Sequence, residues 1–178
     1  MTAIALLLAA VLLAIHGGGS PWLVAAAVVA AAIAGTTLPD LDLALGLGHR
    51  SALLHSVLPA AVAAAADRRC WPVAAGLGLG VGLHMTADLF PNGMRGYATI
   101  KLPLFGSIGA WPSYFWIMAN AAAALAGGAW LLSQVAAPRP ARATLIAVGL
   151  LGAAYLFRTD GGWWALIMFA GLGWLAMR

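Results

Sequence analysis

The acidic and histidine side chains of this chain gather in one part of the sequence. All five acids are aspartates, and four histidines accompany them. Six of these residues are of the types and spacing that bind metal ions: Asp40, Asp42, His49, His55, His84 and Asp88. Mixed imidazole and carboxylate ligands suit Zn²⁺, Mn²⁺ or Fe²⁺ better than Ca²⁺, which prefers oxygen alone. The sequence therefore predicts a divalent-metal site for one or two ions, with Zn²⁺ favoured and Mn²⁺ as the second choice.

Two pairs in this set have spacings that restrict their geometry. His84 and Asp88 are four residues apart in an apolar segment, so a helix places both side chains on one face. Asp40 and Asp42 are two apart and follow Pro39, which disfavours helix at the residue before it. Their carboxylates are expected to point at one position only if this turn is not helical.

The third pair, His49 and His55, requires a change of structure between its members. Six residues apart on one helix, they would be separated by about 600° and would lie on different faces. They converge if His49 lies in a loop and Ser51 caps a helix that carries His55. His16 and Asp67 are expected outside the cluster, as a helix-packing residue and as an interfacial charge.

The composition indicates which kind of protein must position these groups. The 178 residues are 63% hydrophobic and 8% charged, with a mean hydropathy of +0.96. Soluble domains carry about 25% charged residues, and disordered chains are poor in apolar ones. A polytopic membrane protein is therefore predicted. An ionisable group at membrane depth costs several kcal/mol unless it is paired or bound, which makes the cluster a candidate functional site.

The remaining charges and the single cysteine add two exclusions. The net charge is +4, but the nine Lys and Arg residues are scattered, without the basic stripe and interleaved aromatics of a nucleic-acid surface. Nucleic acid is therefore not an expected partner, and membrane lipids are. Cys70 is alone, so no disulfide within the chain is expected.

Seven apolar segments separated by glycine, proline and charge are expected to be helices. They cover approximately residues 2–15, 21–35, 51–66, 71–89, 113–136, 141–157 and 162–177. Several are shorter than the roughly 20 residues that cross a bilayer, so some are expected to be short, tilted or re-entrant. The predicted fold is an all-α transmembrane bundle of about six or seven helices. It forms a single domain, 1–178, with the metal site in 35–110 and scaffold helices in 113–178.

The order of the helices places the two unusual loops, 36–50 and 91–112, on the same side of the membrane. Five Lys or Arg residues fall on the opposite side and four on this one. Positive charge favours the cytoplasm, so the site is expected on the periplasmic or exterior face of a bacterial-type inner or plasma membrane. The first segment is interpreted as a retained helix rather than a signal peptide, since it lacks a basic start.

The motifs around the cluster resemble those of the YdjM-like family of membrane-bound metal-dependent hydrolases. The similar pieces, all within about 35–110, are Leu38-Pro39-Asp40-Leu41-Asp42, His49-Arg50-Ser51, Leu54-His55-Ser56, Gly82-Leu83-His84, Asp88-Leu89-Phe90, Pro91-Asn92-Gly93 and Leu102-Pro103-Leu104-Phe105. Many members have threonine where this chain has Leu54, and a shorter spacing between the two histidines of that segment. The resemblance implies a metal-dependent hydrolase and fixes no substrate.

The sequence hypothesis is a membrane-embedded hydrolase that cleaves a phosphoester of a lipid or lipid-linked molecule. The six cluster residues are the expected ligands, and Asp40 is either a ligand or the base that orients a water. Arg50 is expected to act in catalysis and substrate binding. Arg95 and Lys101 are further candidates for holding an anionic head group, although interfacial anchoring explains them equally well.

Two other classes of function remain open from the sequence. Intramembrane His and Asp also build ion relays, as in a metal- or proton-handling transport protein. The later helices offer only Asn120, Ser133 and Gln134 as polar side chains, which disfavours a path across the membrane. The other alternative is a membrane scaffold with a structural metal site. The oligomeric state is not predicted.

Overall fold

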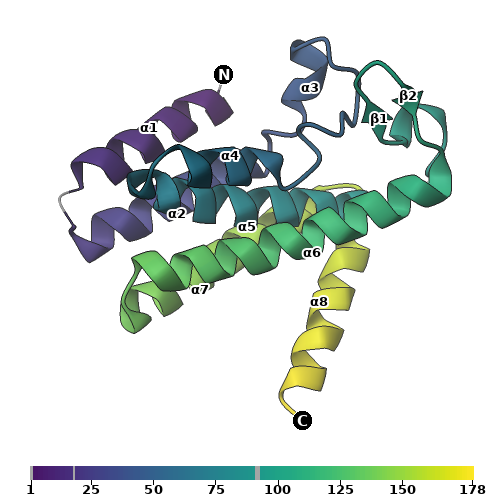
Figure 1. Cartoon of the computed structure of the whole chain (residues 1–178). Coiled ribbons are helices and arrows are strands. Elements are labelled where there is room, and N and C mark those ends of the chain that lie inside the picture. The colour runs from purple at the N-terminus through teal and green to yellow at the C-terminus, as the bar shows by residue number, and fades with distance from the viewer. Residues whose placement is uncertain (1, 18, 91–92) are drawn as a thin grey trace.

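Helices make up most of the computed structural model, which describes residues 2–17, 19–90 and 93–178 (Figure 1). The α-helices are α1 (Thr2–His16), α2 (Pro21–Gly35), α3 (Leu41–Ala44), α4 (Leu58–Ala66), α5 (Trp71–Asp88), α6 (Ala110–Val135), α7 (Pro138–Arg158) and α8 (Gly162–Ala176). Short 3-10 turns, η1 (Arg68–Cys70) and η2 (Gly96–Ala98), precede α5 and a small antiparallel hairpin of β1 (Lys101–Leu102) and β2 (Gly106–Ser107). The fold is therefore all-α apart from this hairpin, as predicted.

The third predicted helix, 51–66, is wrong over its first half. Residues 51–57 form turns, and α4 begins only at Leu58, with Pro59 in its first turn. The reason lies in the preceding backbone. Arg50 has a left-handed φ of 57°, and Ser51 forms a β-bridge with Lys101. Ser51 therefore does not cap a helix, and His55 lies in a turn.

Helix α5 is the central element of the bundle, and small residues let its neighbours approach it. Gly76 and Gly80, one turn apart, face α2, where a Cβ would collide with backbone of Val28 and Ala32 respectively. The other two glycines of the alternating run face α6. A Cβ on Gly78 would lie 2.8 Å from the carbonyl oxygen of Ala124. Close backbone contact of this kind is how small residues join membrane helices.

Three helical segments are long and apolar enough to cross a membrane: 68–88, 110–135 and 138–158. The first includes α5 and is mostly enclosed, with 83% of its apolar window buried by the other helices. The corresponding buried share is 33% for the window in α6 and 28% for that in α7. These two helices therefore present apolar side chains outward, while α5 supplies the interior.

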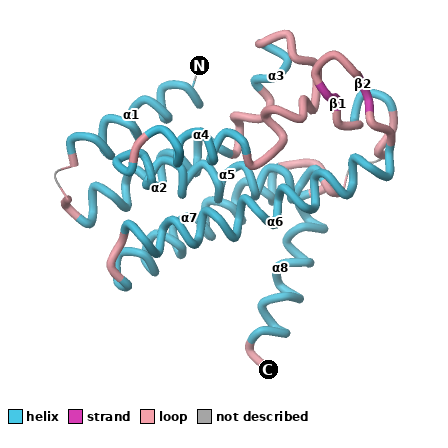
Figure 2. The backbone as a smooth tube through the Cα atoms, viewed as in Figure 1, coloured by secondary structure: helices cyan, strands magenta, loops and turns pink. Residues whose placement is uncertain are grey.

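The connections that hold the candidate residues meet at one end of the bundle (Figure 2). The backbone N–H of Ala52 donates to the carbonyl of Lys101 at 2.9 Å, and the N–H of Lys101 donates to the carbonyl of Arg50 at 3.0 Å. These bonds join the segment after α3 to the β1–β2 hairpin. The described residues of loops 36–50 and 91–112 therefore lie at the same end of the bundle. Pro91 and Asn92 lie outside that description.

Helix α8 leaves the bundle at a steep angle to α6 and α7 (Figure 1). Its corner is set by Gly161, whose φ is 79° and whose missing Cβ would lie 2.7 Å from carbonyl oxygens of Ala87 and Phe90. Ala165, in the first turns of α8, is buried against Ala87. The start of α8 is therefore fixed to the end of α5 that carries the candidate site.

Candidate metal centre

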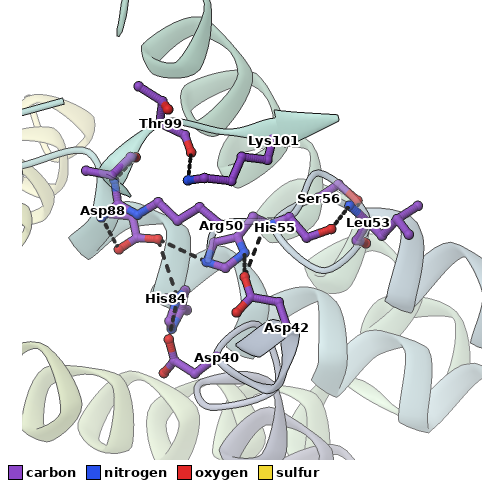
Figure 3. A network of polar contacts seen from close by, with 12 residues as sticks. Asp40, Asp42, Arg50, Leu53, His55, Ser56, His84, Asp88, Thr99 and Lys101 are labelled. Atoms are coloured by element: carbon purple, nitrogen blue, oxygen red, sulfur yellow. Dashed lines mark hydrogen bonds and ion pairs between the residues drawn. The ribbon is translucent and has the colours of Figure 1, made fainter. Parts of the chain in front are cut away.

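Four segments bring candidate ligands together beside the C-terminal end of α5 (Figure 3). Helix α5 supplies His84 and Asp88, whose spacing puts them on one face, as predicted. Asp40 immediately precedes α3, and Asp42 lies within it. The Asp40–Asp42 turn is thus partly helical, whereas the two carboxylates were expected to point at one position only if the turn is not helical. They point instead at different histidines, Asp40 at His84 and Asp42 at His55.

His55 lies between two carboxylates and is fully buried. Its Nδ1 is 3.4 Å from Oδ2 of Asp42, and its Nε2 is 3.4 Å from Oδ2 of Asp88. The backbone around it is held in place, because the Trp116 indole donates to the His55 carbonyl at 2.8 Å. Asp42 is held in turn by the N–H of Ser51, which donates to its Oδ2 at 3.0 Å. Both side chains are therefore fixed before any ligand arrives.

His84 is oriented by groups on its other side. Its Nδ1 lies 2.9 Å from the carbonyl oxygen of Thr36, which only accepts hydrogen bonds. This contact places the proton on Nδ1 and leaves a lone pair on Nε2, the usual arrangement of a metal-binding histidine. Nε2 lies 3.4 Å from Oδ2 of Asp88 and 3.9 Å from Oδ1 of Asp40. The ring therefore presents its free nitrogen to the carboxylates.

The facing atoms of this cluster are buried without hydrogen bonds among the described residues. They are Asp42 Oδ1, both ring nitrogens of His55, Nε2 of His84 and Oδ2 of Asp88. Leaving a buried polar group unsatisfied costs about 1–3 kcal/mol, so five together call for a missing partner. Two ligands of a tetrahedral ion at zinc distances are about 3.4 Å apart, as these N···O pairs are. A divalent cation bound by His55 Nε2, His84 Nε2 and Asp88 Oδ2 satisfies three of these atoms at once, while His55 Nδ1 faces Asp42 on the other side of the ring.

Asp40 supplies the open side of the cluster. Its carboxylate is 57% exposed, against 0% for Asp42 and 17% for Asp88. Asp40, His55 and His84 each offer one ligand atom within 4.8 Å of those of the other two. These three residues could hold a metal ion, and Asp88 Oδ2 lies within 3.4 Å of both histidines. An exposed carboxylate beside buried ligands is accessible to a substrate and to water.

His49 lies next to the cluster and has a different environment. Its ring stacks on Tyr97 with centroids 4.3 Å apart, and its centroid is 6.4 Å from that of His55. Burial lowers the pKa of His49 from 6.5, so the ring is neutral near pH 7. Its Nδ1 is buried with no hydrogen-bond partner among the described residues. His49 is therefore placed at the wall of the site, one ring away from the innermost ligands.

Arg50 forms an ion pair and a hydrogen bond with other residues of the protein. One guanidinium nitrogen forms an ion pair of 2.8 Å with Asp88 Oδ1, and the other donates to the Ala98 carbonyl at 2.7 Å. The Arg50 side chain is 7% exposed. The pair fixes Asp88 so that its second oxygen, Oδ2, faces the histidines.

A cavity of about 510 Å³ opens beside the cluster. It is lined by Asp40, His49, Arg50, His84, Ala87, Asp88, Tyr155, Thr159 and Asp160. Lys101 and Arg95 are not among these lining residues. The Lys101 ammonium instead donates to the carbonyls of Tyr97 and Thr99 at 2.7 and 2.9 Å, while Arg95 is exposed. Burial lowers the pKa of Lys101. Arg50 is therefore the basic residue of the cavity.

Three lining residues come from the C-terminal part of the chain, which was expected to be scaffold alone. Tyr155 on α7 places its hydroxyl 3.0 Å from Nδ1 of His84, and Thr159 and Asp160 follow on the same corner. The sequence alone places Asp160 near this face and explains it most simply as a helix cap, but the residue that caps α8 is Gly161. Tyr155 carried no signal, since one tyrosine in an apolar segment has many packing roles. His16 and Asp67 lie outside the cluster, as predicted, but His16 is exposed, so its interpretation as a helix-packing residue is wrong.

Comparison with known proteins adds no assignment. No family model, curated protein or solved structure matches this chain. The resemblance to the YdjM-like hydrolases therefore stays a prediction that rests on the motifs alone.

The chemistry of the site follows from its own residues. Two histidines and carboxylates form a donor set suited to Zn²⁺ or Mn²⁺. The cavity beside them is polar on the side of the cluster, where the carboxylates of Asp40, Asp88 and Asp160 and the Asp88-paired guanidinium of Arg50 line it. Asp40 and Tyr155 place a carboxylate and a hydroxyl at its wall. The arrangement can hold a cation, an anion and a water side by side.

Proposed function

We propose that this protein is a membrane-embedded metal-dependent hydrolase that cleaves a phosphoester of a lipid or lipid-linked molecule. The observation that carries the proposal is the set of three buried atoms, His55 Nε2, His84 Nε2 and Asp88 Oδ2, which have no hydrogen-bond partner among the described residues and lie 3.4 Å apart across each His–Asp pair. Groups of this kind are retained inside a protein when a bound ion satisfies them. A substrate-sized cavity adjoins them.

His55, His84, Asp40 and Asp88 would hold the ion, with Asp42 behind His55. A divalent metal there supplies a Lewis acid that polarises a phosphoryl oxygen and activates water near neutral pH. The Thr36 carbonyl fixes the proton of His84 on the side away from the ion, so Nε2 stays available. The ion pair with Arg50 holds Oδ1 of Asp88 in the same way, so that Oδ2 stays available.

The groups at the open wall act on substrate and water. Asp40 would bind the ion through one oxygen, and its second oxygen can accept a proton from an attacking water, since Asp40 is the most exposed carboxylate of the cluster. Arg50 contributes positive charge that stabilises an anionic phosphoryl group in the cavity. A phosphoester is favoured over a neutral ester for this reason.

We infer a position in the membrane from the outward faces of the helices. Large apolar side chains are exposed along α6, α7 and α8, among them Trp130, Leu150 and Trp174. Such faces are stable in hydrocarbon and not in water. The bundle would then span the membrane with the metal centre near one surface, and the charge pattern favours the exterior face of a bacterial-type inner membrane for that centre.

Activity measured on purified protein tests the proposal. Phosphate release is followed from phosphatidic acid and from a polyprenyl phosphate in detergent micelles, with Zn²⁺ or Mn²⁺ added after chelation. We expect metal-dependent release that falls about 100-fold or more in Asp40→Asn. Asp67→Asn is the matched control, because Asp67 is exposed and lies outside the cluster.

Two results would contradict the proposal. Release that survives chelation and the Asp40→Asn change would place the reaction elsewhere. A protein that keeps a stoichiometric metal but cleaves neither substrate, while its ligand variants unfold, would support the scaffold with a structural metal site.

A further inference from the structure

An apolar cavity of about 480 Å³ lies between α5, α6, α7 and α8, away from the metal ligands. All of its lining residues are apolar, and they include Leu83, Leu125, Val148, Leu156 and Phe169. Its size is within the range of roughly 300–1,000 Å³ that small-molecule sites occupy. A lining without polar side chains does not hold ordered water, so the fitting occupant is a hydrocarbon.

A third, smaller cavity adjoins both the apolar cavity and the metal cavity. This third cavity, of about 120 Å³, shares Leu83 and Val148 with the apolar cavity and Tyr155 with the metal cavity. Thr36, whose carbonyl orients His84, also lines it. The three cavities therefore share lining residues on α5 and α7.

The two large cavities follow the same two helices. On α5, Leu83 directly precedes the ligand His84, and on α7, Leu156 directly follows Tyr155. From these positions the apolar lining extends toward the opposite ends of both helices, as far as Leu145 on α7. The separation of Leu145 and Leu156 along the axis is about 16 Å. A molecule in both cavities would lie along the helices with its polar end at the metal.

One glycine of α7, Gly149, lies at the wall of the apolar cavity. A Cβ built on Gly149 meets nothing within 4 Å, although Gly149 lines the cavity. The steep departure of α8 makes room on the other side, where Phe169 and Leu166 complete the lining (Figure 1). The space is therefore a feature of how α7 and α8 diverge and not of one missing side chain.

We propose that this apolar cavity binds the hydrocarbon chain of a membrane amphiphile whose anionic head group lies at the metal centre. The inference rests on the proposed function and adds a binding site for the hydrocarbon chain of the proposed lipid substrate. The orientation argues for a lipid chain over a second copy of the protein. The lining residues Leu83 and Leu156 lie directly beside His84 and Tyr155 in the chain, so a hydrocarbon chain held here has one end next to the metal cavity.

Photo-cross-linking tests this assignment without relying on catalysis. The probe is a phosphatidic acid with a diazirine at the end of one acyl chain, added to purified protein in lipid nanodiscs. Labelled positions are mapped by mass spectrometry, with metal content measured on the same sample. We expect the label on cavity residues of α5, α7 and α8, at Leu83, Leu156 and Phe169 among others.

A matched pair of variants controls the experiment. Gly149→Leu adds a side chain inside the cavity at a position where a Cβ meets nothing within 4 Å. We expect cavity labelling to fall by at least about tenfold, which is the loss of binding expected when about two methylene groups of the lipid chain lose their apolar contacts. Gly171→Leu makes the same change on α8, where a Cβ also meets nothing within 4 Å. Gly171 does not line the apolar cavity. Its cavity labelling is expected to match the wild type, and both variants should retain the metal.

The outcomes separate this inference from the hydrolase proposal. Labelling spread evenly over outward-facing residues, and equal in both variants, would overturn the chain site whatever the metal content. Cavity labelling in a protein that binds no metal would leave the chain site standing and remove the hydrolase. A wild-type dimer that lacks cavity label and dissociates in Gly149→Leu would assign the space to a second copy and overturn the inference.

Discussion

Nε2 of His84 and Oδ2 of Asp88 lie 3.4 Å apart on adjacent turns of α5, and both are buried without a hydrogen-bond partner among the described residues. Good N–H···O hydrogen bonds are shorter, at about 2.7–3.2 Å. The other faces of both side chains are well bonded, to the Thr36 carbonyl and to Arg50. The protein thus fixes each group from behind and leaves the facing atoms to a ligand.

Replacing Tyr155 by Phe removes the hydroxyl that lies 3.0 Å from Nδ1 of His84. We expect metal affinity to fall about tenfold, the low end of the effect of losing an outer partner, since the Thr36 carbonyl still holds the ring. Competition with a chromophoric chelator measures the affinity. Tyr114→Phe serves as the control, because Tyr114 is not among the residues that line the metal cavity. Equal affinities in both variants would deny Tyr155 this role.

Arg50→Gln leaves Asp88 buried without its ion pair. We expect the free energy of unfolding of the metal-free protein to fall by about 3 kcal/mol, because breaking a buried ion pair leaves the remaining charge buried without a partner. Denaturation in detergent micelles measures it, and Arg142→Gln at an exposed position should change it by no more than about 0.5 kcal/mol. Adding Asp88→Asn to Arg50→Gln should restore part of the loss. Unchanged stability in Arg50→Gln would mean that the guanidinium serves the substrate alone.

Gly80→Ala tests the close contact of α5 with α2. A Cβ at this position would collide with the Ala32 carbonyl, so we expect a loss of about 1–3 kcal/mol from overpacking. The same change at Gly171, where nothing lies within 4 Å, should be neutral or stabilising, because alanine favours helix. Thermal unfolding of both variants makes the comparison. Similar unfolding temperatures would show that α2 does not pack on Gly80.

His49 gives the protein a pH dependence with a defined sign. Burial lowers its pKa in the folded state below the ordinary 6.5, so the unfolded chain binds the proton more readily. The stability that His49 contributes is complete above about pH 6.5 and is lost as the pH falls through the lower folded value. Metal-free wild type should therefore lose stability relative to His49→Gln between about pH 7.5 and pH 5.5. A constant difference across this range would contradict the assigned shift.

The helical pattern was predictable because apolar segments, glycines and prolines mark their own ends. Pro21 begins α2 and the His84–Asp88 spacing survives in α5. The segment 51–57 was not predictable, since its turns depend on the left-handed Arg50 and on a bridge to Lys101, 50 residues later in the chain. Local propensity carries no information about such a pairing.

The same distinction applies to the site. The types and spacing of Asp40, His55 and His84 indicated a metal centre from the sequence, and the structure places their ligand atoms together. The contribution of Tyr155 was missed, because it arises only from the packing of α7 beside α2 and α5. The engagement of Arg50 with Asp88 was missed for the same reason: long-range contacts decide whether a cation faces a substrate or a neighbouring carboxylate.

Metal content of the detergent-purified protein tests the central claim most directly. Plasma mass spectrometry of wild type is compared with His84→Ala, Asp88→Ala and the exposed control His16→Ala, with circular dichroism to confirm that each remains helical. We predict near-stoichiometric zinc or manganese in the wild type and in His16→Ala. We predict that the folded His84→Ala and Asp88→Ala variants lose this metal. Wild-type protein that binds neither metal after reconstitution, or folded variants that retain it, would contradict the metal centre.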